Sequence, residues 1–334
     1  MVHQYKNNGY NIVLDVNSGA IHVVDDVTYD VIELFEDNSA KEIIEKLVDR
    51  YPQTEIEEAI QEVNELKDNE ELFTEDTYKE RIIDFKKRQT VVKALCLHIA
   101  HDCLACRYCF AEEGEYHGRR ALMSYETGKQ ALDFLIANSG SRRNLEVDFF
   151  GGEPLMNWDV VKQLVAYGRE QEKLHDKHFR FTLTTNGVLL NDEIMEFANK
   201  EMDNVVLSID GRKEVHDRMR PFRKGAGSYD LIVPKFQKFA ESRHQDKYYV
   251  RGTYTHFNTD FSKDVLHLAD LGFKQISVEP VVAQPTDEYA LKESDLPVLF
   301  DEYDRLAAEM VKRNKAGNGF NFFHFMIDLE GGPC

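Results

Sequence analysis

Six apolar, strand-forming stretches alternate with helix-forming stretches in the larger, second part of the chain, and this alternation constrains the fold more than any other feature. Strands that alternate with helices are typical of parallel βα units. Six units are too few to close an eight-unit barrel. The sequence therefore predicts an α/β fold with an open, partial (βα)6 parallel barrel, whose site lies at the carboxyl ends of the strands. The expected strands are 93–99, 145–150, 179–184, 205–209, 248–254 and 275–278.

A smaller domain is expected before the barrel, over residues 1–72. Asn-Asn-Gly and Asn-Ser-Gly turns flank a stretch of alternating apolar residues, which predicts a short antiparallel meander. Ser39 with Glu42, and Thr54 with Glu57, fit capping boxes that begin helices. Strands followed by three short helices indicate a winged-helix-like domain. Because it is rich in Asp and Glu, we expect its sheet edge to bind a peptide as an added strand rather than DNA.

The rest of the chain divides into three expected segments, and the composition limits the classes of partner that the protein can bind. We expect a charged linker at 73–90, the barrel at 91–282 and a bridging region at 283–334. The formal net charge of −19 argues against nucleic-acid and membrane partners and is compatible with a basic peptide. The sequence begins with no export signal and has no apolar run that could cross a membrane, so we expect a cytoplasmic protein.

Three of the five cysteines, Cys103, Cys106 and Cys109, occur at every third position of one short segment. Three thiolates can hold three irons of a 4Fe-4S cluster and leave the fourth iron open to a small-molecule ligand. Bacterial ferredoxins use the same C-x2-C-x2-C spacing, but their run continues to a fourth cysteine. Here Phe110 and acidic residues follow instead, so the segment favours a cluster with an open iron.

The same three thiols are also compatible with a zinc site. His98, His101 or His117 could complete a Cys3His ligand set. A C-x-x-C redox pair would leave the third thiol unused, and the odd number of cysteines disfavours disulfides. A non-catalytic protein that binds peptides or carries electrons, with a structural or redox-active metal site, is therefore an alternative to an enzyme. Cys96 lies in an apolar strand and is expected to pack in the core.

The second expected strand ends in a Gly-Gly-Glu-Pro segment. Gly151 and Gly152 would let the backbone approach a ligand closely, and Glu153 could accept a hydrogen bond from a cationic amine. A Gly-Gly turn after a buried strand is common in itself. The segment therefore indicates a binding site only in combination with the polar residues expected on the same rim.

Polar residues also follow the next three expected strands. Asn186 ends the third, whereas Ser208 and Asp210 project from the same side of the fourth and could bind ribose hydroxyls. Arg251 lies on the fifth strand and could pair with a carboxylate. Since these strand ends converge on one rim, the sequence predicts one binding site there.

Together these segments resemble the radical S-adenosylmethionine (radical SAM) superfamily over residues 90–282. The resemblance rests on the cysteine run with Tyr108 before its last thiol, Gly-Gly-Glu-Pro at 151–154, Ser208 to Asp210, and Glu279-Pro280-Val281. In that family the open iron binds the amino and carboxylate groups of S-adenosylmethionine. The reduced cluster cleaves this cofactor to methionine and a 5'-deoxyadenosyl radical, which abstracts hydrogen from the substrate. The run here is one residue shorter than the family pattern, C-x3-C-x2-C.

The resemblance implies a role for each matching residue. Cys103, Cys106 and Cys109 would ligate the cluster, and Tyr108 would lie near the adenine. The Gly-Gly-Glu segment would hold the methionyl amine, the strand-four residues the ribose, and the strand-five arginine the carboxylate. The implied cofactor-binding set is Tyr108, Gly151, Gly152, Glu153, Asn186, Ser208, Asp210, Arg251, Pro280 and Val281.

The segment 110–120 narrows the resemblance to maturases of the cysteine-rich SCIFF peptides, which have a peptide-recognition N-domain and a SPASM C-domain. This implies a ribosomally synthesised precursor peptide whose leader binds residues 1–72, and Cys-to-Thr thioether crosslinks of the ranthipeptide type. SPASM domains hold auxiliary 4Fe-4S clusters, so the chain is expected to stop where that domain begins, with Cys334 as its first ligand. Flavodoxin or ferredoxin would supply electrons. A sulfatase-maturing enzyme is the nearest alternative.

Overall fold

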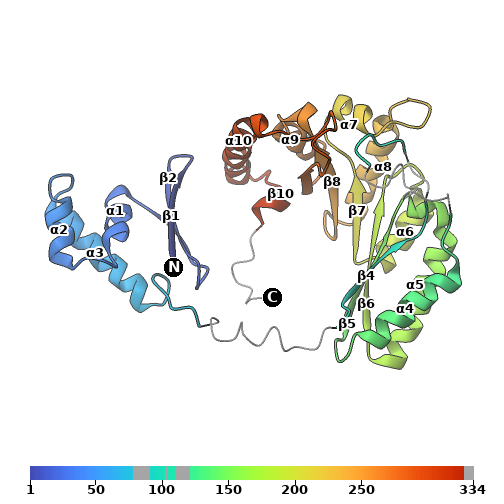
Figure 1. The fold of residues 1–334 in the computed structure, drawn as a ribbon, viewed down its shortest axis with the longest axis horizontal. Coiled ribbons are helices and arrows are strands. Elements are labelled where there is room, and N and C mark those ends of the chain that lie inside the picture. The colour runs from blue at the N-terminus through green and yellow to red at the C-terminus, as the bar shows by residue number, and fades with distance from the viewer. Residues whose placement is uncertain (78–90, 102–103, 110–120, 327–334) are drawn as a thin grey trace. The chain divides into compact units, whose positions relative to one another are not determined.

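The computed structural model describes residues 1–77, 91–101, 104–109 and 121–326, and within it the chain forms two compact units. The first contains residues 1–77 and the second residues 91–326 of the described chain. Figure 1 shows a small sheet with helices in the first unit and a larger sheet in the second. No described helix is both long and apolar enough to cross a membrane. The expected linker falls mostly outside the described residues.

The first unit begins with a three-stranded antiparallel sheet in the order β1-β2-β3. Its strands are β1 (Val2–Asn7), β2 (Tyr10–Asp15) and β3 (Ile21–Val24). Asn8 and Gly9 join β1 to β2 with positive φ angles of 48° and 80°. A two-residue hairpin turn of type I′ requires positive φ at both of its central residues. The predicted meander is therefore present, with β1 as a further strand before it.

Three helices follow and share one hydrophobic core with this sheet: α1 (Asp26–Leu34), α2 (Ala40–Leu47) and α3 (Gln53–Asp68). The predicted capping box of Ser39 and Glu42 begins α2 and is confirmed. The second predicted box is wrong, because α3 begins at Gln53 directly after Pro52 and has no side-chain cap. Thr54 therefore lies inside the first turn of the helix and does not cap it.

A parallel sheet of seven strands, in the order β10-β9-β8-β7-β6-β5-β4, forms the centre of the second unit. The six predicted strands are all present, and a very short seventh strand pairs with β9. The strands are β4 (Ala94–His98), β5 (Asn144–Phe150), β6 (His178–Thr185), β7 (Asn204–Ser208), β8 (Tyr248–Tyr254), β9 (Gln275–Pro280) and β10 (Asn321–Phe322).

Helices cover one face of this sheet, and Figure 1 shows α4, α5 and α6 along the side of β4, β5 and β6. Alternate strand residues such as Val147, Phe181 and Val250 are fully buried beneath the helices. Residues between them face the inner, more polar side of the open barrel. The helices are α4 (Tyr125–Asn138), α5 (Trp158–His175), α6 (Asp192–Glu201), α7 (Lys213–Met219), α8 (Tyr229–Ser242), α9 (Ser262–Asp270) and α10 (Leu296–Lys315).

Cys96 does not pack in the core as predicted. It lies on β4 and is exposed, whereas its neighbour Leu97 is buried in the core. Because consecutive strand residues face opposite sides, the apolar side of β4 is supplied by the leucines, and the thiol faces away from it. An apolar run does not reveal which of its alternate residues point inward.

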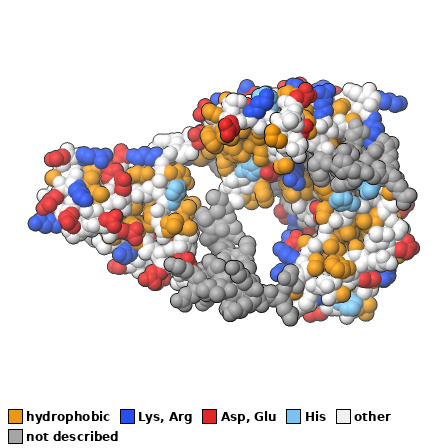
Figure 2. Space-filling model, in the orientation of Figure 1, with side chains coloured by type: hydrophobic (Ala, Val, Ile, Leu, Met, Phe, Trp, Pro, Cys, Tyr) orange, Lys and Arg blue, Asp and Glu red, His pale blue; other side chains and the backbone are white. Residues whose placement is uncertain are grey.

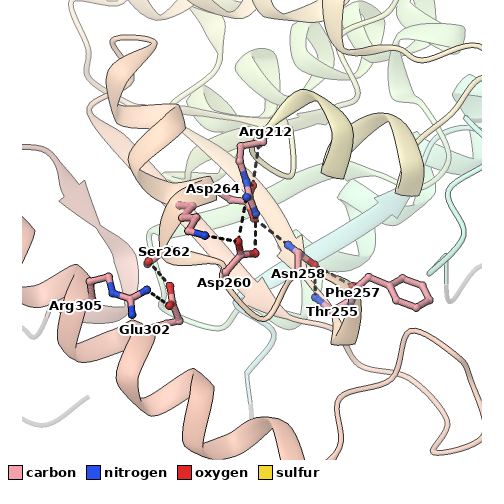
Figure 3. Close-up of polar contacts among 10 residues, drawn as sticks. Arg212, Thr255, Phe257, Asn258, Asp260, Ser262, Asp264, Glu302 and Arg305 are labelled. Carbon is pink, nitrogen blue, oxygen red and sulfur yellow. Dashed lines mark hydrogen bonds and ion pairs between the residues drawn. The ribbon is translucent and has the colours of Figure 1, made fainter.

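A partly buried ion-pair network fixes the loop after β7 to α9 (Figure 3). Asp264 is fully buried and accepts from the Nε of Arg212 at 2.8 Å and from its backbone N–H at 2.9 Å. The same guanidinium donates to Asp260 at 2.8 Å, and Asn258 donates to Asp264 at 3.1 Å. A side chain at Gly211 would lie only 2.3 Å from the Asp264 Cβ, so the loop approaches α9 closely. This network holds the polar end of β7 in place.

Candidate functional site

A cavity of about 560 Å³ opens at the carboxyl ends of the barrel strands. It brings ten of the sequence-predicted site residues into one wall. These are Cys106, Tyr108, Cys109, Gly151, Gly152, Asn186, Ser208, Arg251, Pro280 and Val281. Glu153 and Asp210 are buried next to this wall without lining it, and Cys103 and Cys334 lie outside the described residues.

The Gly-Gly segment after β5 forms its part of the wall with backbone alone. Gly151 and Gly152 have φ angles of 81° and 47°, a region that glycine adopts readily. A Cβ added at Gly151 would lie 3.0 Å from the Cα of His98, so a side chain there would collide with β4. The turn therefore needs glycine, and it presents backbone polar groups to whatever fills the cavity.

Glu153 ties the end of β5 to the end of β6. Its carboxylate accepts from the backbone N–H of Leu155 at 3.0 Å, from the hydroxyl of Thr185 at 2.8 Å and from the backbone N–H of Asn186 at 2.7 Å. Burial raises the pKa of this carboxyl to about 7, against the opposing effect of these hydrogen bonds. With both oxygens engaged by the chain itself, the side chain orients the two strand ends.

Asp210 is fully buried and contacts the segment that carries the cysteines. Both of its carboxylate oxygens lie 2.8 Å from the hydroxyl of Tyr108, and one also accepts from the backbone N–H of Thr253 at 3.1 Å. Burial raises the pKa of Asp210 to about 6, although the charge of Arg220 opposes the shift. Of the predicted ribose pair, Ser208 alone lines the cavity.

Arg220 also lines the cavity, although it was not among the residues predicted from the sequence. It follows α7 directly, and its Nη1 donates to the hydroxyl of Tyr108 at 2.9 Å. The segment contains Arg218, Arg220 and Arg223, and no spacing in the sequence distinguishes the one that turns into the barrel. Arg220 and Arg251 together give the cavity two cationic side chains.

Glu279, at the end of β9, also lines the cavity. Burial would raise its pKa, but hydrogen bonds from Ser277 and His324 lower it below the usual value. His324 contacts the Glu279 carboxylate at 2.8 Å and the hydroxyl of Tyr303 at 2.8 Å. The wall therefore combines cationic and anionic groups, as a zwitterionic ligand such as an amino acid requires.

The described cysteines fit an iron–sulfur cluster at this rim. Cys106 and Cys109 both line the cavity, and the backbone N–H of Cys109 donates to the carbonyl of Cys106 at 3.1 Å. Thiolates are soft ligands suited to iron–sulfur clusters. These cysteines would hold a cluster in the same cavity as the two arginines and the glycine backbone, groups that match the carboxylate and amine of an amino-acid ligand.

Comparison with known proteins decides the family. The family model of the Radical SAM superfamily matches residues 103–272, which is about half of the chain. The chain belongs to the radical SAM superfamily. This assignment agrees with the parallel sheet and with the resemblance that the sequence motifs predicted. It also implies a 4Fe-4S cluster and S-adenosylmethionine as the resident cofactors.

Two curated relatives of this radical SAM chain are informative. It is 22% identical over 253 residues to the radical SAM cyclopropyl synthase TigE of Paramaledivibacter caminithermalis, covering 67% of this chain and 52% of that protein. It is 27% identical over 200 residues to a serine-type anaerobic sulfatase-maturating enzyme of Bacteroides thetaiotaomicron, covering 58% and 45%. The chain thus spans about half the length of the curated relatives that it matches.

Solved structures share the fold. Native anSMEcpe with bound AdoMet and Kp18Cys peptide superimposes with a TM-score of 0.60 at 19% identity, covering 70% of this chain and 64% of that one. Streptococcus suis SuiB bound to S-adenosylmethionine superimposes with a TM-score of 0.52 at 15% identity, covering 96% and 71%. At these identities the likeness concerns the fold.

Proposed function

We propose that this radical SAM enzyme installs Cys-to-Thr thioether crosslinks in a ribosomally synthesised, cysteine-rich precursor peptide, as in the SCIFF ranthipeptide family. The observation that carries the catalytic part is the cavity at the strand ends, where two cysteines, a glycine backbone and two arginines meet. The peptide part is supported by relatives whose names describe enzymes that act on sulfatases.

In this proposal Cys103, Cys106 and Cys109 hold the cluster. When bound, the reduced cluster supplies homolytic cleavage of S-adenosylmethionine. The chain's own residues bind and orient the cofactor: the backbone of Gly151 and Gly152 receives the amine, and arginine side chains receive the carboxylate. Ser208 and Asn186 offer polar groups to the ribose side, and the main chain of Pro280 and Val281 borders the adenine end.

The crosslinking step needs one carbon–hydrogen bond of threonine and the sulfur–hydrogen bond of cysteine to break while a carbon–sulfur bond forms. One hydrogen atom leaves with 5'-deoxyadenosine. The thiol proton goes to a base, and one electron goes to an iron–sulfur acceptor. Auxiliary 4Fe-4S clusters of a SPASM domain, with Cys334 as a first ligand, would be that acceptor. Flavodoxin or ferredoxin would reduce the radical SAM cluster.

Residues 1–72 are proposed to be a winged-helix-like domain that binds the leader of the precursor. Among the described residues β3 pairs only with β2, so its other edge carries backbone groups that an added strand could pair with. Ile21 and Val23 of this strand are 47% and 64% exposed. Figure 2 shows acidic side chains interspersed over this unit, which suits a basic leader. The linker 73–90, barrel 91–282 and bridging region 283–334 complete the proposed division.

A sulfatase-maturing activity is the second candidate, because such enzymes are among the relatives. Mass spectrometry separates the two. The protein, a reductant and S-adenosylmethionine are incubated without oxygen with cysteine-rich precursor peptides encoded beside this chain, and in parallel with sulfatase-derived peptides.

We expect a loss of two hydrogens in a precursor peptide, located by fragmentation between a cysteine and a threonine. The same peptide without its leader should react poorly, because residues 1–72 would no longer hold it. Modification of the sulfatase peptide alone would overturn the thioether proposal and support the second candidate.

A further inference from the structure

Tyr108 links the cysteine segment to a buried residue at the carboxyl end of β7. It lies between Cys106 and Cys109 in sequence, and its hydroxyl is 2.8 Å from both carboxylate oxygens of Asp210. Arg220 donates to the same hydroxyl at 2.9 Å, and its Nη1 is 3.7 Å from Asp210. One hydroxyl can donate a hydrogen bond and accept another at once. The tyrosine therefore completes a three-residue contact that is neutral in total charge.

The partner of this tyrosine is itself held rigidly. The backbone N–H of Thr253 on β8 donates to Asp210 at 3.1 Å, and the Asp210 N–H lies 3.3 Å from Nδ1 of His216. His216 is fully buried, and burial lowers its pKa to about 3, so its ring is neutral and Nδ1 can accept. Its Nε2 contacts the hydroxyl of Ser228 at 2.9 Å. Asp210 is thus fixed from β8 and from the residues around α7.

Ser228, the contact of His216, also contacts Arg220. The hydroxyl of Ser228 donates to the backbone carbonyl of Arg220 at 2.8 Å. On either side of that residue, Met219 and Pro221 accept backbone hydrogen bonds from Arg107 and Ala105, each at 2.9 Å. Two backbone bonds and one side-chain contact therefore clamp residues 105–108 onto residues 219–221.

We propose that Tyr108, Asp210 and Arg220 form a lock that positions the cysteine segment for its cluster, and that Asp210 acts there as a positioning residue rather than as a ribose ligand. The inference rests on the proposed radical SAM function. Two observations favour it: Asp210 has no exposed surface, and its carboxylate is already bonded to Tyr108 and Thr253.

If this lock positions the cysteine segment, removing the Tyr108 hydroxyl should make the protein release the iron of its cluster faster. In Tyr108→Phe the ring remains, while Asp210 and Arg220 lose the group between them. A hydrogen bond to a charged group changes an equilibrium by about tenfold to a hundredfold. We expect the anaerobically reconstituted 334-residue chain to release iron to a chelator about tenfold faster than wild type, followed by the fading of its visible absorbance.

Tyr167→Phe is the matched control, because Tyr167 on α5 also donates to an aspartate, Asp133 on α4, outside the cavity. This variant should release iron at the wild-type rate. Both iron-free variants should still unfold cooperatively, and iron release is measured well below their thermal midpoints, which separates positioning of the cluster from loss of folding. Equal iron release by Tyr108→Phe and Tyr167→Phe would overturn the lock.

Asp210→Asn separates the lock from a ribose contact. The lock predicts faster iron release together with a similar affinity for S-adenosylmethionine in the fraction that keeps its cluster. A ribose ligand predicts the reverse, weaker cofactor binding with normal iron retention, and that result would refute the inference. Failure of the radical SAM function itself would look different, since wild type would then take up no iron and sulfide.

Discussion

At the scale of single residues, the barrel interior contains a carboxylate that is incompletely satisfied. Asp148 lies on the inner side of β5, and its Oδ1 is buried and accepts no hydrogen bond from the described residues. Burial raises its pKa from 3.8 to about 6, although a hydrogen bond from Thr184 and the charge of Arg251 oppose the shift. Its ionised form is therefore unfavourable in the folded state.

This residue predicts a pH dependence of stability. Between about pH 4 and about pH 6 the folded state binds more protons than the unfolded state, so stability falls as the pH rises and then levels off. Asp148→Asn removes this effect. We expect the variant to exceed wild type by about 1 to 2 kcal/mol in unfolding free energy above pH 6, after allowance for solvent screening. Urea unfolding should show the difference vanish near pH 4, and a constant difference at all pH values would contradict this account.

Residue positions could be predicted from sequence better than their orientations. The strand-end residues Gly151, Ser208 and Arg251 line one cavity, because parallel strands end on the same rim. The same rule says nothing about which way a side chain turns. Glu153 and Asp210 are buried behind the wall, held by backbone N–H groups that no sequence pattern reveals.

At the scale of elements, apolar runs bounded by polar turns were sufficient to find the six main strands of the parallel sheet. The seventh, β10, has only two residues and is too short to show any periodicity. Helix starts were less predictable, because Thr54 has a fitting capping partner while α3 begins at Gln53, directly after Pro52. Two local sequence signals can therefore indicate different starts for the same helix, and the packing of the folded chain decides which of them is used.

The link between β7 and α9 gives a prediction at this scale. Arg212 donates to Asp260 and Asp264 in a geometry that only a planar guanidinium can match. Arg212→Lys keeps the charge but leaves buried Asp264 short of donors, so we expect a loss of about 1 to 3 kcal/mol in unfolding free energy. Arg180→Lys, an exposed residue 3.7 Å from Glu146, should change it by less than about 0.5 kcal/mol. Equal effects in urea unfolding would contradict a special role for the network.

At the scale of the whole molecule, the sequence indicates two functions in one chain, a metal site in the barrel and a peptide-binding edge in the first unit. The charged segment 73–90 and the change from a meander to βα units predict this division into two parts. The reaction on the peptide was not predictable in the same way. The crosslink that we propose would join residues of a substrate that the chain does not encode.

The most direct measurement tests the proposed metal site of the barrel and the proposed peptide-binding edge of the first unit in the same experiment. Wild type and Cys106→Ala are reconstituted without oxygen with iron and sulfide, and both iron content and 5'-deoxyadenosine release from S-adenosylmethionine are measured. We predict that wild type is brown and releases 5'-deoxyadenosine when reduced, whereas Cys106→Ala does not, because it lacks one of the three cluster thiolates. Both should bind the leader peptide equally. A colourless wild type that binds zinc instead of iron and never cleaves the cofactor would contradict the account.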